Sequence, residues 1–282
     1  MASSYEERLD KLLTIGTALS SERNLDKLLE MILDLARELT IADAGTLYLV
    51  NEADKVLDFE IAHNDTLGTR VGGTSGIAPS VPPVPLEKDG EINLANVSAY
   101  SANTNELVNI PDVYEADDSQ GFDFSGPRNY DKIFGYHTKS MLSVPMRNHE
   151  DEIIGVLQLL NAKDETSSEL IPFSPEYVTL TESLASQAAV ALTNAKLIND
   201  LKELFDSFIQ STAGAIERKS PYTGGHIRRV AELTMLIARK VNDMTEGPYA
   251  SVHFSEDELE ELRIAAWMHD LGKITTPVHV VD

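Results

Sequence analysis

The most constraining feature of this chain is a long segment of helical pattern, residues 174–219, that separates two regions of different character. Residues 176–213 contain neither glycine nor proline, the two residues that most often interrupt a helix. Ser174 is a suitable N-cap residue, and Pro175 fits the first position of a helix. We therefore predict one continuous connecting helix with a folded region on each side of it.

Apolar side chains recur along this helix at alternating steps of four and three residues. Such a heptad repeat is typical of a coiled coil, and an Asn at a core position fixes the register of a parallel dimer. We therefore predict a homodimer that forms through the helix at residues 187–211. The alternative is that this stripe packs against the sheet or against the following helices. We call the stripe the seam; it consists of Val190, Asn194, Leu197, Leu201, Leu204 and Phe208.

The region before the connecting helix combines helical and strand patterns. Residues 1–23 and 24–39 have leucines at helical spacing, and Asn24 is the expected N-cap of the second helix. Runs rich in β-branched and aromatic residues then predict strands, and the glycines and prolines between residues 72 and 85 predict a long irregular loop. This mixture indicates an α+β domain. The predicted strands are residues 44–50, 56–62, 107–113, 140–146 and 152–160, and a short helix is predicted at 94–102.

Two of these strands carry a family resemblance. Their sequences are Gly135-Tyr136-His137-Thr138-Lys139-Ser140-Met141-Leu142-Ser143-Val144-Pro145-Met146 and Ile154-Gly155-Val156-Leu157-Gln158-Leu159-Leu160-Asn161. These segments resemble the GAF family, most closely the GAF domains of cyclic-nucleotide phosphodiesterases and cyclases, over about residues 24–195. The resemblance implies a sensor domain with an antiparallel sheet flanked by helices and a pocket for a small molecule.

A further motif distinguishes the GAF domains that bind nucleotides. Nucleotide-binding GAF domains carry an Asn-Lys pair, then a Phe, and then an Asp-Glu pair. Asn161 and Phe173 match this motif and are the candidate ligand-binding residues. Ala162 stands in place of the Lys, and Tyr177 and Val178 stand in place of Asp-Glu. Because the ion pair of that motif cannot form in its usual position, the resemblance implies a small-molecule pocket without favouring a cyclic nucleotide.

The region after the connecting helix, residues 201–282, has a helical pattern and carries the candidate metal-binding and catalytic residues. The neighbouring His269 and Asp270 offer a nitrogen and a carboxylate ligand, which suit a divalent metal ion. Lys273 offers a point charge for a phosphate group. His226 is a second candidate ligand from the helix before. Because the chain has no cysteine, its histidine and carboxylate ligands suit iron, manganese or nickel, and iron and manganese are the metals that we expect first.

Two segments of this region together resemble the HD superfamily, and within it the HD-GYP phosphodiesterases, which cleave cyclic dinucleotides and chiefly cyclic di-GMP. The resemblance implies His226, His269 and Asp270 as metal ligands, and Asp270 and Lys273 as catalytic residues. The remaining ligands of the family are expected beyond residue 282, so we expect an incomplete HD domain, an absent or incomplete metal centre, and no hydrolysis by this chain. The matching segments are Pro221-Tyr222-Thr223-Gly224-Gly225-His226 and His269-Asp270-Leu271-Gly272-Lys273-Ile274.

These observations predict a signalling protein of the bacterial type. Its expected parts are an N-terminal helix (1–23), a GAF sensor domain (24–195), a signalling helix that overlaps the end of the sensor (174–219), and an all-α HD segment (201–282). In the leading interpretation the GAF domain regulates an HD-GYP phosphodiesterase through the helix. The alternatives are a sensor and dimerisation module with a non-catalytic HD remnant, and an HD nucleotide phosphohydrolase of another type.

Composition excludes several other classes. The chain has 23 basic and 46 acidic residues and a formal net charge of −23, so its surface repels nucleic acids and anionic membranes. The lack of cysteine excludes disulfides and thiolate metal sites. No apolar run approaches the roughly 20 residues of a membrane span, and the N-terminus lacks the pattern of a signal peptide. We therefore expect a cytoplasmic protein that does not bind nucleic acid.

Overall fold

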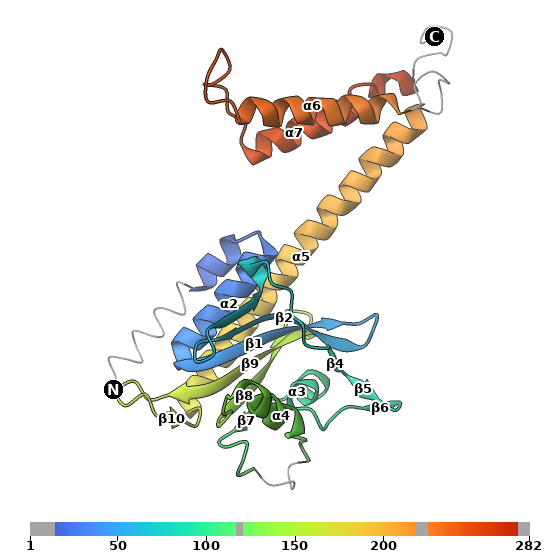
Figure 1. Ribbon diagram of the computed structural model, residues 1–282. Coiled ribbons are helices and arrows are strands. Elements are labelled where there is room, and N and C mark those ends of the chain that lie inside the picture. The colour runs from blue at the N-terminus through green and yellow to red at the C-terminus, as the bar shows by residue number, and fades with distance from the viewer. Residues whose placement is uncertain (1–14, 117–120, 218–224, 276–282) are drawn as a thin grey trace. The chain divides into compact units, whose positions relative to one another are not determined.

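The computed structural model describes residues 15–116, 121–217 and 225–275 (Figure 1). The chain divides into two compact units, Met1–Leu197 and Ile198–Asp282. The division falls inside the longest helix, α5 (Pro175–Glu217). The predicted connecting helix is therefore present as one continuous element. No helix in the described ranges is long and apolar enough to cross a membrane.

The first unit is built on an eight-stranded sheet whose main path has the order β3-β2-β1-β9-β8-β7 and whose neighbouring strands are all antiparallel. The predicted strands are confirmed, with end positions that differ by a few residues. The short strands β10 (Leu170–Ile171) and β4 (Val84–Pro85) pair with β9 and β2. The main strands are β1 (Ala42–Asn51), β2 (Val56–Asn64), β3 (Thr69–Gly72), β7 (Val108–Ile110), β8 (Met141–Arg147) and β9 (Ile153–Lys163).

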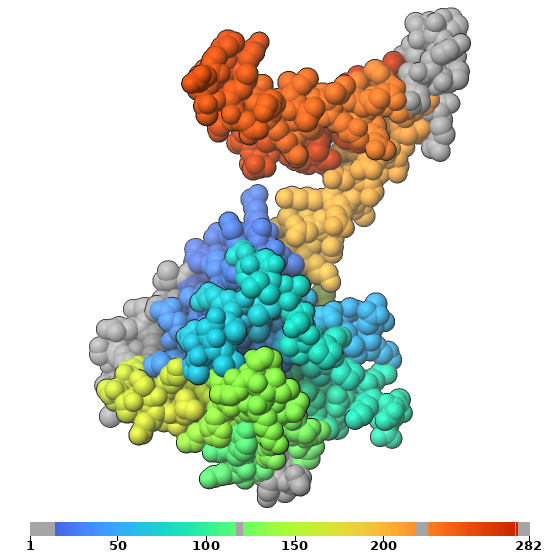
Figure 2. Space-filling view, in the orientation of Figure 1, coloured from blue at the N-terminus to red at the C-terminus, as the bar shows by residue number. Residues whose placement is uncertain are grey.

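Two helices cover one face of this sheet. The helix α2 (Leu25–Thr40) begins at Asn24, whose side chain accepts the N–H of Lys27, as the sequence predicts. α2 and the first part of α5 bury their leucines and alanines against the inward side chains of β1, β8 and β9 in the main core. Residues 15–21 are also helical, whereas the rest of the predicted N-terminal helix lies outside the described residues. Figure 2 shows the blue side chains of α2 in contact with the cyan segment after β3.

The opposite face of the sheet is covered by α3 (Val97–Thr104) and by the irregular segments between β3 and β7, which include a second small sheet of β5 (Glu87–Lys88) and β6 (Glu91–Ile92). α3 contacts β8 and β9. The helix α4 (Ser125–Phe134) follows β7 and was not predicted, because Gly126 and Pro127 fall in its first turn. Proline is tolerated there since the first N–H groups of a helix have no partner within it.

Gly155 in β9 allows a close approach between strands of the sheet. A Cβ atom at this position would overlap the backbone oxygen of Tyr48 on β1 and would lie 2.6 Å from Cε of Met146 on β8. Overpacking of this kind costs about 1–3 kcal/mol. We therefore expect Gly155→Ala to lower the free energy of unfolding by about that amount, as measured by urea denaturation. The control Gly126→Ala adds a Cβ with no atom within 4 Å and is expected to be neutral; equal midpoints for both variants would contradict the expectation.

The second unit contains the end of α5, then α6 (His226–Asn242), α7 (Glu256–Met268) and the short 3-10 turn η3 (Leu271–Ile274). α6 and α7 form a helical hairpin, seen in orange and red in Figure 1. Asn242 closes the connection through two 2.8 Å hydrogen bonds to the backbone of Phe254. A capping box of Ser255 and Glu258 starts α7.

The part of α5 in the second unit presents two different apolar faces. Ile209, Ala213 and Ile216 are buried, and the latter two pack against the start of α6 and the end of α7. Three seam residues, Leu201, Leu204 and Phe208, are 67%, 69% and 62% exposed. Within the described ranges, therefore, the following helices occupy the first face and leave the seam open.

Candidate metal centre

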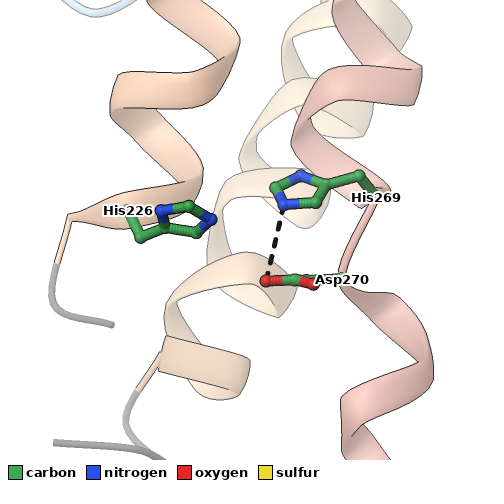
Figure 3. A group of neighbouring side chains, drawn as sticks. All are labelled: His226, His269 and Asp270. Atoms are coloured by element: carbon green, nitrogen blue, oxygen red, sulfur yellow. Dashed lines mark ion pairs between the residues drawn. The ribbon is translucent and has the colours of Figure 1, made fainter. Parts of the chain in front are cut away.

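Three side chains with metal-binding groups converge at one end of the helical hairpin. His226 is the first residue of α6, His269 is the C-cap of α7, and Asp270 follows directly. One ligand atom from each of them lies within 4.8 Å of the others. Figure 3 shows the two imidazole rings facing each other from different helices, with the carboxylate of Asp270 beside His269. The residues predicted as ligands are therefore brought together by the fold.

Asp270 does not lie on a helix, although residues 201–282 have a helical pattern. α7 ends at Met268, and Asp270 lies in the turn that leads to η3, with φ −100° and ψ 8°. In this turn the carboxylate bends back, so that its Oδ2 lies 3.4 Å from Nε2 of His269. The side chains of His269 and Asp270 therefore approach the site from similar directions. Two neighbouring side chains of a regular helix would diverge more.

The orientation of the two histidine rings leaves nitrogen atoms available for a metal. Nδ1 of His269 lies 2.8 Å from the backbone oxygen of Ala266, so a proton on Nδ1 leaves the lone pair on Nε2 facing Asp270. A backbone carbonyl that orients a histidine in this way is typical of metal-binding histidines. The centroids of the His226 and His269 rings are 5.5 Å apart, at an interplanar angle of 67°.

Lys273 lies against the carboxylate of Asp270. Its Nζ donates a 2.7 Å hydrogen bond to Oδ2. Burial raises the pKa of Asp270, but the hydrogen bond from Lys273 and the nearby His269 and His226 outweigh burial, so the net shift of the pKa is downward. The carboxylate is thus ionised at neutral pH, as a metal ligand must be.

The chemistry of this set fits a divalent ion. Two imidazoles and one carboxylate suit iron, manganese or zinc, and three protein ligands leave coordination positions open for water or substrate. The cationic Nζ of Lys273 beside these open positions would favour an anionic ligand such as a phosphate. The geometry therefore satisfies the first requirement of a metal-dependent phosphohydrolase site.

The two candidate ligand-binding residues of the first unit have structural contacts. The side-chain oxygen of Asn161 accepts the N–H groups of Lys139 and Ser140, and its nitrogen donates to Tyr136 and to the backbone oxygen of His137. Phe173 is 3% exposed and belongs to the core between the sheet, α2 and α5. In this structure both side chains are engaged in holding the fold together.

A buried ion pair lies close to Asn161. Lys163 pairs with Asp43 of β1, which also accepts hydrogen bonds of 2.8 Å from Tyr136 and from Thr66. Burial raises the pKa of Asp43, but the hydrogen bonds from Lys163, Tyr136 and Thr66 outweigh burial, so the net shift of the pKa is downward. A Lys–Asp ion pair therefore does form in this domain. Its two residues do not occupy the positions that form the ion pair in the nucleotide-binding motif.

Lys163→Met is expected to destabilise the first unit, because it leaves the Asp43 carboxylate buried without its cation. Breaking a buried pair costs about 3–5 kcal/mol, and the lower end applies because the Lys163 side chain is 30% exposed. Since the folded pKa of Asp43 is lowered, its stabilisation is present above pH 4 and is lost as the pH falls through the folded pKa. The variant should therefore lose less stability than the wild type between pH 5 and pH 3.

Urea denaturation at several pH values measures this effect. The control is Lys55→Met, which removes an exposed ion pair with Glu87 and is expected to cost less than about 1 kcal/mol at every pH. An equal loss of unfolding free energy in the two variants would contradict the expectation that the buried ion pair contributes more to stability than the exposed one.

Polar side chains also lie between α3 and the sheet. Gln158 of β9 stands opposite Thr46 of β1 and Ser143 of β8, and its amide donates a 3.0 Å hydrogen bond to Ser98 of α3. The hydroxyl oxygens of Ser143 and Ser101 are buried and have no hydrogen-bond partner among the described residues. Buried polar atoms without a partner are rare in folded proteins. The space between α3 and the sheet is therefore a candidate ligand-binding site, which the sequence analysis did not predict.

Comparison with known families agrees with this architecture. Residues 24–192 match the family model of the GAF domain, and residues 223–282 match that of the HD domain. Because the first match spans more than half of the chain, the protein belongs to the GAF domain family. Its GAF domain is followed by a segment of the HD domain type, as the resemblance implied.

Individual relatives cover different shares of the chain. The dual 3',5'-cyclic-AMP and -GMP phosphodiesterase 11A of Takifugu rubripes is 27% identical over 186 residues, which are 63% of this chain and 19% of that protein. The GAF domain of a phosphoenolpyruvate-protein phosphotransferase from Coxiella burnetii has 15% identity and a TM-score of 0.50, over 70% of this chain and 98% of that one. At this identity the structural likeness shows the fold alone.

Proposed function

We propose that this chain carries the sensor and part of the catalytic region of a metal-dependent phosphodiesterase of the HD-GYP type, acting on cyclic dinucleotides and chiefly on cyclic di-GMP. The observation that carries the proposal is the convergence of His226, His269 and Asp270 within 4.8 Å, with Lys273 on the carboxylate. The HD match over residues 223–282 supports the family assignment.

Each residue of the cluster has a role in this proposal. His226, His269 and Asp270 would hold a divalent ion, which supplies charge neutralisation on the phosphate and activation of water when it is bound. Lys273 would orient a phosphate oxygen and help to neutralise its charge. Asp270, whose pKa is lowered by Lys273 and the neighbouring histidines, would keep Lys273 in place and remain ionised at neutral pH.

The proposal is tested by metal content and ligand binding of the purified chain. We expect the incomplete centre to bind a single Mn²⁺ or Fe²⁺ ion, and cyclic di-GMP to bind more tightly to the metal-loaded protein than to the metal-free protein in calorimetry. Turnover of cyclic di-GMP and of bis-(4-nitrophenyl) phosphate is expected to be absent, because three ligand residues do not hold the two metal ions that this hydrolysis uses. Failure to bind any of these metals would overturn the proposal; turnover would overturn only the expected inactivity.

The same measurements separate the two alternatives. A sensor and dimerisation module, which the exposed seam favours, would bind neither metal nor cyclic dinucleotide and would still dimerise. An HD nucleotide phosphohydrolase of another type would bind metal and prefer nucleoside phosphates to cyclic di-GMP. A cytoplasmic location and a homodimer through residues 187–211 remain part of the leading proposal.

For the sensor domain we infer a small polar ligand other than a cyclic nucleotide, bound in the layer between α3 and the sheet. The buried hydroxyls of Ser101 and Ser143 support this location, because a ligand could supply the partners that these atoms lack. Millimolar cyclic AMP and cyclic GMP are expected to leave the melting temperature unchanged. A saturable increase with either nucleotide would contradict the inference.

A further inference from the structure

The last residue of α5, Glu217, holds the backbone on both sides of His226. Its Oε2 accepts the N–H of Gly225 at 3.0 Å, and its Oε1 accepts the N–H of Ile227 at 2.8 Å. Hydrogen bonds from backbone N–H groups to a carboxylate are stronger than neutral ones. One side chain therefore restrains the backbone before and after the first candidate metal ligand.

The start of α6 depends on this contact because its own N-cap cannot provide it. The N-cap is Gly225, with φ 73° and without a capping side chain. The first N–H groups of a helix need an external acceptor, and a negative charge is favoured at this positive helix end. Glu217, at the end of α5, supplies both the hydrogen-bond acceptor and the negative charge.

Packing joins the same three helix ends. Ala213 and Ile216 near the end of α5 form a buried cluster with Ile227 of α6, and Trp267 of α7 packs against it. Ile227 directly follows His226, and Trp267 precedes His269 by two positions. The end of α5 therefore touches both helices that carry the metal-binding side chains, and Glu217 bonds to the backbone at the start of α6.

We propose that Glu217 is a positioning residue for the metal centre: it ties the end of α5 to His226, so that a change in how α5 packs changes the placement of His226 relative to His269 and Asp270. This inference rests on the metal centre of the proposed function. Regulation through such a link requires that the two packing states of α5 differ in their affinity for metal or substrate.

The test compares Co²⁺ binding by the full chain and three variants, with visible absorption as the readout of affinity and coordination geometry. Glu217→Ala is expected to weaken Co²⁺ binding by about 10- to 100-fold, the usual effect of losing a residue that orients a metal ligand, and to alter the spectrum of the Co²⁺-saturated protein. Glu217→Gln keeps one acceptor oxygen and should fall between Ala and wild type. Glu203→Ala removes an exposed carboxylate of the same helix and should match the wild type.

The outcomes distinguish the inference from the proposal beneath it. Wild-type affinity and an unchanged spectrum in Glu217→Ala would overturn the positioning role while leaving the metal centre intact. No Co²⁺ binding by the wild type would overturn the metal centre and the inference together. A purely structural role would lower the melting temperature of the variants but leave the spectrum at Co²⁺ saturation unchanged, and this result would also overturn the inference.

Discussion

Asp270→Asn is expected to lower the affinity of the protein for Co²⁺ or Mn²⁺ by more than 100-fold. Loss of a residue that only orients a metal ligand already costs about 10- to 100-fold, and Asp270 is the only carboxylate of the described cluster. The substitution keeps the size of the side chain but removes its charge. The positive charge of Lys273, which donates to Oδ2 of Asp270, would then no longer be offset by that carboxylate.

Equilibrium dialysis or the free Mn²⁺ signal in electron paramagnetic resonance measures this loss directly. The matched control is Asp243→Asn, which changes an exposed Asp at the C-terminal end of α6 and should bind metal like the wild type. His269→Ala should reproduce the loss, because it removes a nitrogen ligand from the same cluster. Retention of wild-type affinity in both Asp270→Asn and His269→Ala would show that any bound metal lies elsewhere.

Local patterns predicted much of the first unit because its strands alternate cleanly between two different faces. Leu47, Leu157 and Leu159 point toward α2 and α5, whereas Tyr48 and Val156, their neighbours in the chain, belong to the core on the other face. The helix α4 escaped prediction because Gly126 and Pro127 resemble a loop. Proline is tolerated in the first turn of a helix but not in its interior, and the chain context that allows a helix to begin at Ser125 is not visible in local spacing.

The candidate site was predictable in its residue types and less so in its geometry. His226, His269 and Asp270 were identified from their motifs, but the end of α7 at Met268 depends on how the chain leaves the hairpin. The role of Glu217 is a tertiary contact between the ends of two helices, and no periodicity encodes it. The contacts of Asn161 depend on its left-handed backbone, with φ 59°, which points its amide into the loop before β8 rather than toward a ligand.

The second large effect is expected at the seam. Leu197→Lys combined with Leu201→Lys should convert a dimer of this chain into a monomer. Burying one leucine contributes about 1.5–3 kcal/mol, and the double variant removes four leucines from a symmetric interface. A loss of at least about 6 kcal/mol corresponds to more than 10⁴-fold in the dissociation constant. Lysine has nearly the helix propensity of leucine, so α5 itself should persist.

Sedimentation velocity over a range of concentrations measures this change. The control exchanges the charges of Lys196 and Glu203, two exposed residues of α5 outside the seam, and should leave the dimer intact.

A persistent dimer in the seam variant would reject the seam as the interface and direct attention to α6. That helix also exposes apolar side chains, with Leu236 and Ile237 66% and 63% exposed. Leu236→Lys separates the two surfaces: it should leave a seam dimer unchanged and should dissociate a dimer that forms through α6. The seam is the stronger expectation, because its heptad spacing places Asn194 at a core position, where paired asparagines fix a parallel register. A parallel register would place the two α5 helices side by side with their C-terminal ends level, so that both copies of Glu217 would respond to the same change in packing.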